Sequence, residues 1–216
     1  MFEYVEDKEY LSRVRRVCGG IMQDFCHSLK VEYDIGASFY LVGSGARNLI
    51  VQNALNPIDL DYNLEIIRCN DFNDCRTIKE CAKKAFNKAL SMNGWGDCED
   101  STSSLTTQRR RFEQGNQTAF SMDVCIVFTD NDDNIYRLIH KKTGNTYYDQ
   151  YYWNQALHSS GIRKKVDFIK SQGKWSLVRE QYLRIKNKYL TSNEHNHPSF
   201  ICYIEAVNNV YNSIKN

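Results

Sequence analysis

The sequence lacks any apolar run long enough to span a membrane, and its charges nearly balance. Its first residues, MFEYVEDKEY, are acidic and form no secretory apolar segment, so we expect a cytoplasmic protein without membrane partners. A formal net charge of +2 neither requires nor excludes a nucleic-acid partner. Repeats and low-complexity tracts are also missing, so the chain is not a repeat array.

The eight cysteines show no metal or disulfide pattern. Cys69, Cys75 and Cys81 are evenly spaced and Cys98 follows, whereas zinc sites usually pair cysteines about two to four residues apart. A chain of 216 residues, 42% of them hydrophobic, can bury a core without disulfides. We therefore expect buried or free thiols and a globular protein.

Hydrophobic periodicity predicts a mixed α+β region followed by helices. Helices are predicted where apolar residues recur every three or four positions, at 7–29, 46–53, 74–92, 161–170, 174–190 and 198–214. Strands are predicted at 38–42, at 58–67, as a pair within 103–129 joined at 114–116, and as a hairpin within 134–148. We predict an α+β fold with a mixed sheet flanked by helices over 1–150, and a helical region over 151–216 packed on it.

Three aspartates stand out against this pattern. Asp59 and Asp61 lie two apart on a strictly alternating strand, so they point to the same face. Asp123 interrupts an otherwise apolar, central strand and needs a partner there. That partner is either an arginine such as Arg109 or Arg111, or a metal shared with the other two aspartates. Glu65 lies about 13 Å from Asp61 at about 3.3 Å per residue, too far to join them.

The segment Gly43-Ser44-Gly45 ends the preceding predicted strand. A glycine there lets the backbone approach a phosphate, and the serine hydroxyl can donate to a phosphate oxygen. Taken alone, the segment is an ordinary turn. Combined with the later aspartates it becomes specific.

The combination resembles the polymerase-β-like nucleotidyltransferase superfamily. The matching segments are LVGSGARNLIVQNALNPIDLDYNLEI and FSMDVCIVF, within residues 38–128, and the Gly43–Arg47 stretch is also similar to minimal nucleotidyltransferases. The gap from Ser44 to Asp59 is slightly long for the family, which a loop at 54–57 could absorb. The resemblance implies that residues 1–150 form a nucleotidyltransferase catalytic domain.

The resemblance also implies a mechanism with two Mg²⁺ ions, for which Mn²⁺ could substitute. Asp59 and Asp61 would bind both ions, and Asp123 would bind the ion nearer the acceptor and help to deprotonate its hydroxyl. Gly43 and Ser44 would bind the β- and γ-phosphates. The substrate would be a nucleoside triphosphate, with ATP the first choice, and pyrophosphate would leave.

Other side chains have competing interpretations. Arg47 would either reach a phosphate or stay a solvated arginine, and Arg109 and Arg111 would touch the triphosphate or acceptor, or pair with acidic residues. The aromatic cluster at 147–153 would stack a base, or, as we favour, pack between the sheet and the C-terminal helices.

The acceptor stays open, because one fold and one metal site serve many acceptors. RNA such as a tRNA end, a protein hydroxyl and a small molecule such as an aminoglycoside are all compatible with the motif. Cyclic or oligonucleotide synthesis is less expected, since those relatives usually carry a longer helical region. A non-catalytic nucleotide- or RNA-binding module of the same fold is the alternative, against which the three intact aspartates argue.

Overall fold

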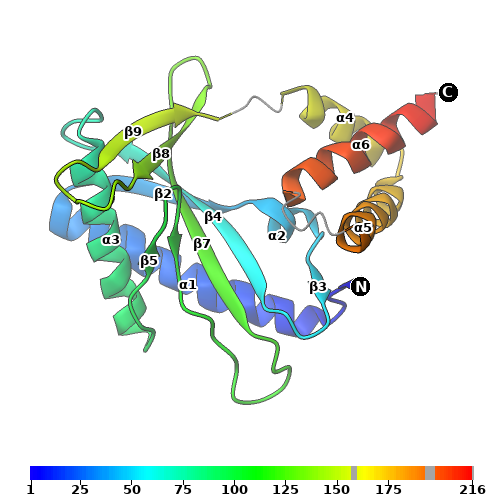
Figure 1. Ribbon diagram of the computed structural model, residues 1–216, viewed down its shortest axis with the longest axis horizontal. Helices are drawn as coiled ribbons and strands as arrows, with labels where there is room; N and C mark the ends of the chain where they lie inside the picture. Colours follow the sequence, from blue (N-terminus) through cyan, green and yellow to red (C-terminus); the bar gives the residue numbers. More distant parts are fainter. Residues whose placement is uncertain (157–159, 193–197, 216) are drawn as a thin grey trace. The chain divides into compact units, whose positions relative to one another are not determined.

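The computed structural model describes residues 1–156, 160–192 and 198–215. The chain divides into two compact units, each built from stretches that are separate in the sequence (Figure 1). The sheet unit consists of Asp7–Val42 and Pro57–Ala156, and the helical unit consists of Met1–Glu6, Gly43–Asn56 and Leu157–Asn216. The predicted boundary between a catalytic domain at 1–150 and a helical region at 151–216 stays a prediction. In the structure, the two early segments Met1–Glu6 and Gly43–Asn56 belong to the same unit as the C-terminal helices.

The described residues of the sheet unit form a seven-stranded mixed sheet with two long helices, which confirms the α+β prediction. Its elements are α1 (Lys8–Tyr33), β2 (Gly36–Leu41), β4 (Ile58–Arg68), α3 (Cys75–Met92), β5 (Glu99–Asp100), β6 (Leu105–Thr106), β7 (Phe120–Thr129), β8 (Ile135–Lys141) and β9 (Gln150–Gln155). The strand order is β2-β4-β7-β6-β5, and β8 pairs with β7 and β9. Only the β4–β7 pair among these is parallel.

The helices α1 and α3 pack together, and their apolar residues form the core with the sheet (Figure 1). Phe25 of α1 stacks on Phe86 of α3 with ring centroids 4.8 Å apart, and both rings are fully buried. Both helices begin at an aspartate: Asp7 accepts from the Tyr10 N–H and Asp74 from the Thr77 N–H. Such caps contribute about 1 kcal/mol each. Helix formation and core packing thus support each other.

The central strand β4 shows the predicted alternation of burial. Its apolar side chains are buried toward the core, whereas the side chains between them are exposed or half-buried. The buried set is Ile58, Leu60, Tyr62, Leu64 and Ile66. Strand β7 lies in register with it, with Phe120 beside Ile58 and Met122 beside Leu60, although Ser121 and Val127 on its other face are also buried. The two central strands therefore turn apolar side chains to the core on one face and carry the polar side chains on the other.

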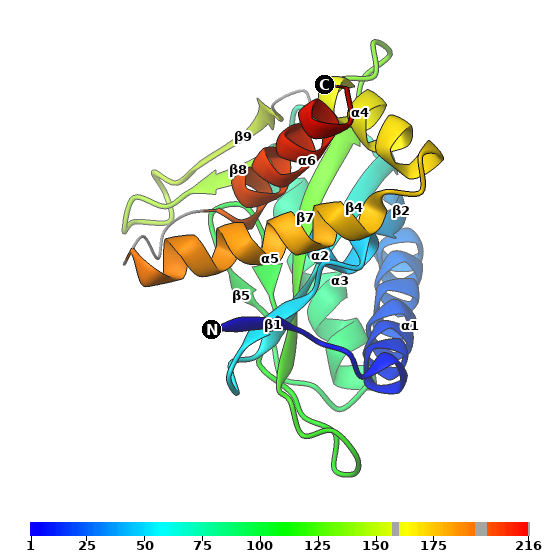
Figure 2. The ribbon, with the colours of Figure 1, turned by 90° about the vertical axis from the view of Figure 1, so that its right-hand side faces the viewer.

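The helical unit has its own small core. Its elements are β1 (Phe2–Tyr4), α2 (Gly43–Arg47), β3 (Val51–Asn53), α4 (Ser160–Ser171), α5 (Trp175–Thr191) and α6 (Ser199–Lys215). Strands β1 and β3 pair antiparallel, and α6 packs against both α4 and α5 (Figure 2). Buried residues such as Tyr182 and Val207 fill the space between the helices. No helix in the described ranges combines the length and apolar character needed to cross a bilayer.

Two predicted elements are wrong. The helix predicted at 46–53 is replaced by the short α2 and strand β3, because Asn48 adopts a positive φ of 57° that ends the helix. The strand predicted around Arg109–Arg111 is an irregular segment with a single bridge at Arg110. All three arginines are exposed, whereas a strand would turn some of them toward the apolar core. The other predicted helices and the strand at 58–67 are confirmed within a few residues.

Candidate active site

The parallel pairing of β4 and β7 brings the three aspartates onto one sheet face. Asp61 lies directly opposite Asp123, and Asp59 lies opposite Ser121. Neighbouring strands are about 4.8 Å apart, so residues in register are immediate neighbours. Asp59 is exposed, and Asp61 and Asp123 are half-buried. The backbone thus places three carboxylates on the polar face of the central strands, opposite the core.

Two hydroxyl groups hold two of these carboxylates. The Ser121 Oγ donates to Asp59 Oδ1, and the Thr106 Oγ1 donates to Asp123 Oδ1 at 2.5 Å. Thr106 reaches Asp123 because the two residues are paired across β6 and β7. Within the described ranges, Asp59 and Asp123 form no ion pair with a lysine, arginine or histidine. The interpretation of Asp123 as an arginine's ion-pair partner is therefore wrong.

Neither hydroxyl partner is predicted from the sequence. A signal for Ser121 exists, because it precedes Asp123 by two residues on one strand and so shares its face. No such signal exists for Thr106, because the pairing of a two-residue strand leaves no periodic pattern. Arg109 and Arg111 are exposed, and their role in substrate binding stays a prediction.

The environment of Asp123 disfavours its negative charge. Burial raises the pKa of this carboxyl, and the nearby Asp59 charge raises it further, while the Thr106 hydrogen bond lowers it. The net effect is a pKa above the ordinary value. A cation between these carboxylates would remove their repulsion. The electrostatics of the site therefore suit a bound cation.

The donor chemistry of the three aspartates fits Mg²⁺. Hard dications prefer oxygen ligands, and Mg²⁺ in such sites takes one or two carboxylates together with water and substrate phosphates. In the part of the chain that the structure describes, no cluster of three or more histidine, cysteine, aspartate or glutamate side chains is arranged to hold a metal ion without further ligands. The hydrogen bonds occupy Oδ1 of Asp59 and of Asp123, so each aspartate keeps a second oxygen for a metal.

The Gly43-Ser44 segment opens helix α2. Gly43 has a φ of 62°, in the left-handed region that glycine adopts without strain. It directly follows Val42, whose N–H donates to the Asp61 carbonyl at 2.8 Å. Arg47 donates to the Gly43 carbonyl at 2.7 Å, and its guanidinium lies 4.5 Å from the Tyr203 ring centroid. Arg47 is thus held by local contacts, and its phosphate contact stays a prediction.

The aromatic cluster at 147–153 is split between two environments. Tyr151 stacks on the His140 ring at 4.1 Å, and Trp153 donates to the Phe72 carbonyl at 2.6 Å, so both pack within the sheet unit. Tyr147 and Tyr148 are 82% and 64% exposed. These two rings therefore do not fill a core.

No protein-family model and no curated protein matches the sequence. The fold is similar to that of the Escherichia coli MS115-1 CdnC structure with ATP, with a TM-score of 0.57 and 14% identity over 94% of this chain and 61% of that chain. The Vibrio cholerae DncV cyclic AMP-GMP synthase with a linear intermediate has a TM-score of 0.56 and 10% identity over 84% of this chain and 62% of that chain. The Elizabethkingia meningoseptica CdnE cyclic dinucleotide synthase with GTP and Apcpp has a TM-score of 0.50 and 13% identity over 94% of this chain and 75% of that chain.

The chain thus spans about three fifths of the length of the first two of these proteins. Sequence identities of 10–14% establish a shared fold and leave the activity open. The structures belong to the superfamily that the Gly43-Ser44 and aspartate pattern resembles. The chain therefore has the nucleotidyltransferase fold of these structures.

Proposed function

We propose that the chain is a magnesium-dependent nucleotidyltransferase, which moves a nucleoside monophosphate from a nucleoside triphosphate to a hydroxyl and releases pyrophosphate. The observation that carries this proposal is the register of β4 and β7, which sets Asp61 opposite Asp123 with Asp59 on the same face. The similarity of the fold to proteins crystallised with ATP or GTP supports a triphosphate substrate.

The three aspartates would hold the metal ions. Bound Mg²⁺ would neutralise charge on the triphosphate and favour ionisation of the attacking hydroxyl. Asp59 and Asp61 would supply oxygen ligands from β4, and Asp123 would supply one from β7. Asp123 lies opposite Asp61 on the neighbouring strand, which suits a role beside the metal ion nearer the acceptor hydroxyl.

The phosphates would be bound by residues outside this group. Gly43 offers a backbone without a side chain and Ser44 offers a hydroxyl, as in the family pattern. Arg47, Arg109 and Arg111 carry positive charge that would bind the triphosphate or the acceptor. Because Arg109 and Arg111 are exposed, binding a phosphate would cost them little desolvation.

The acceptor that we propose is the hydroxyl of a second nucleotide. One similar structure is a cyclic AMP-GMP synthase with a linear intermediate, and another is a cyclic dinucleotide synthase. This acceptor is the one that the sequence analysis favoured least, on the ground that such relatives carry more helical sequence. The matched chains are indeed longer than this one. RNA, protein and small-molecule acceptors become outcomes of the test.

The test is to incubate the protein with Mg²⁺ and each α-³²P-labelled triphosphate, singly and in pairs, alone or with total RNA or total protein. The proposal predicts a labelled nucleotide product that resists phosphatase, formed by the wild type and not by Asp59→Ala/Asp61→Ala. Label on RNA or protein would instead name that acceptor. Triphosphate binding without any labelled product would contradict transfer to a second nucleotide, and would favour a small-molecule acceptor or the alternative, a non-catalytic binding module.

A further inference from the structure

The hydroxyl partners of the two carboxylates are built into the sheet. Ser121 is only 5% exposed and shares the polar face of β7 with Asp123. Thr106 belongs to β6, whose two residues pair with β7. Each hydroxyl donates to Oδ1 of one aspartate, Ser121 to Asp59 and Thr106 to Asp123. A hydrogen bond to one oxygen fixes the plane of a carboxylate and restricts its rotation.

Thr106 is itself held by a chain of hydroxyl groups. The Thr106 and Ser104 hydroxyls lie 3.5 Å apart, and the Ser104 and Ser101 hydroxyls lie 2.8 Å apart. The Ser101 N–H donates to the Ser104 carbonyl at 3.0 Å, which closes the turn between β5 and β6. The β5–β6 hairpin thus helps to orient the Thr106 side chain through the Ser104 and Ser101 hydroxyls.

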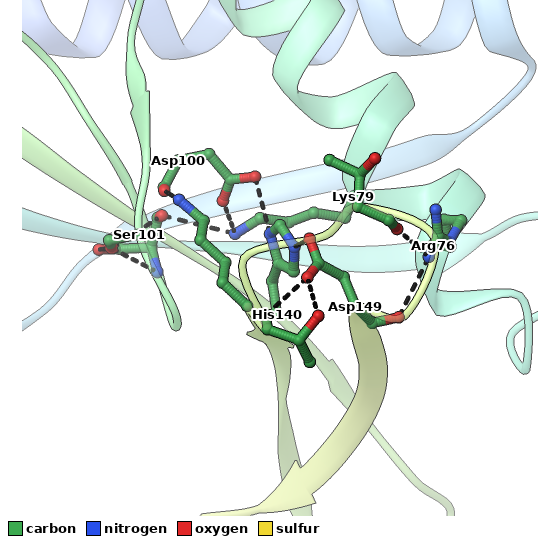
Figure 3. Close-up of polar contacts among 10 residues, drawn as sticks. Arg76, Lys79, Asp100, Ser101, His140 and Asp149 are labelled. Carbon is green, nitrogen blue, oxygen red and sulfur yellow. Dashed lines mark hydrogen bonds and ion pairs between the residues drawn. The ribbon is translucent and has the colours of Figure 1, made fainter.

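A buried group of charged residues fixes this hairpin to the rest of the sheet unit (Figure 3). Asp100 of β5 forms an ion pair with Lys79 at 3.2 Å, and its Oδ2 lies 2.9 Å from the Nδ1 of the His140 ring. The Lys79 Nζ also donates to the Ser104 carbonyl at 3.4 Å, and the His140 backbone N–H donates to the Thr102 carbonyl at 2.7 Å. Helix α3 and strand β8 therefore both hold the loop that leads to Thr106.

We propose that Thr106 is a positioning residue that orients Asp123 for metal binding, and that Ser121 does the same for Asp59. Each hydroxyl holds one carboxylate oxygen and leaves the second for the ion. The inference rests on the proposed function, because it concerns the same metal site. Hydrogen-bond partners of metal ligands commonly affect metal affinity by about 10–100-fold.

A matched control is present on the same two strands. Thr129 of β7 donates to Glu65 of β4 at 2.6 Å, which is the same type of hydroxyl–carboxylate pair. Thr129 is exposed and lies six residues along β7 from Asp123, beyond the three aspartates. Its removal tests whether any hydroxyl–carboxylate pair on this sheet affects metal binding.

The experiment is Mn²⁺ titration followed by electron paramagnetic resonance, on wild type, Thr106→Val, Thr106→Ser, Ser121→Ala and Thr129→Val. We expect Thr106→Val to weaken Mn²⁺ binding by about 10-fold or more, and Thr106→Ser and Thr129→Val to bind like the wild type. Ser121→Ala should lose less, because water can replace the hydroxyl at the exposed Asp59. Thermal melting checks that each variant is folded.

Wild-type affinity in Thr106→Val would overturn the inference, as would equal losses in Thr106→Val and Thr106→Ser, since packing rather than the hydroxyl would then be responsible. Should Thr106→Val not fold, the comparison of Thr106→Ser and Ser121→Ala with Thr129→Val carries the test. A wild type that binds no Mn²⁺ either alone or with a non-hydrolysable ATP analogue would contradict the proposed function itself. The two failures are therefore distinguishable.

Discussion

The sheet unit contains two groups of acidic side chains that are held in different ways. In the buried group, Asp100 lies between Lys79 and His140, and Asp149 accepts from the same His140 at 3.0 Å. In the candidate active site, Asp59 and Asp123 are held by the neutral hydroxyls of Ser121 and Thr106. The first group contains the Lys79 ammonium, whereas the second, among the residues that the structure describes, holds two carboxylates through neutral hydroxyl donors.

The difference separates residues that stabilise the fold from residues whose negative charge is available to the proposed metal ion. Lys79 is 1% exposed, and burial lowers its pKa while the charge of Asp100 opposes that effect. A buried pair of this kind is costly to break, because without Lys79 the Asp100 carboxylate would keep only its contact with the His140 ring. Hydroxyl partners cancel no charge, so the negative potential of the candidate site remains available to a metal ion.

The largest effect is expected from neutralising the candidate site. Asp59→Asn and Asp61→Asn keep the side-chain shape but remove the anionic metal ligand. Since metal ions supply several kcal/mol of transition-state stabilisation, we expect nucleotidyl transfer to fall by about a thousand-fold or more. Urea unfolding should show changes within about 0.5 kcal/mol for the exposed Asp59. Transfer within tenfold of wild type would place the chemistry elsewhere.

The opposite profile is expected from the buried group. Lys79→Met removes the lysine that pairs with the Asp100 carboxylate, and we expect a loss of about 3–5 kcal/mol in the free energy of unfolding. Lys88→Met is the matched control on the same helix, because Lys88 pairs with Glu32 at an exposed position. Exposed pairs contribute less than about 1 kcal/mol. Equal losses in the two variants, measured in urea, would show that the buried group has no special role in stability.

A smaller, pH-dependent effect is expected at Asp149. The Thr143 backbone N–H, at 2.7 Å, and then His140 hold the pKa of Asp149 below its ordinary value. A carboxylate with a lowered folded-state pKa stabilises the fold above its unfolded pKa of about 3.9 and loses that contribution as pH falls through the folded value. Asp149→Asn should therefore destabilise the protein at pH 7, and the difference from wild type should shrink below about pH 4. Thermal melting across pH measures this, and a constant difference would contradict it.

The sequence predicted the carboxylate face because its signal is local. Strict alternation over β4 fixes both the strand and the side on which Asp59 and Asp61 lie. Asp123 was visible because an aspartate interrupts an apolar strand. The pairing of Asp61 with Asp123 confirms that these strands are neighbours, which the sequence implied only through the family pattern.

The remaining features depend on contacts between distant segments. The partners Lys79, Asp100, His140 and Asp149 come from four separate places in the chain, and no spacing rule links them. The run Leu49-Ile50-Val51 fits a helix or a strand, and pairing with β1 decides for a strand. Thr106 acquires its role only from the register of β6 against β7. Hydrophobic periodicity predicts which side of a strand is buried, whereas the strand register determines which residues lie opposite one another.

The most direct test of the account is the dissociation constant of ATP, measured by calorimetry with Mg²⁺ and with EDTA, for wild type and Asp59→Asn/Asp61→Asn. The account predicts that Mg²⁺ tightens ATP binding to the wild type by about tenfold or more and has no effect on the variant. Equal affinities with and without Mg²⁺ in the wild type would contradict it, because the carboxylates would then not form a metal site.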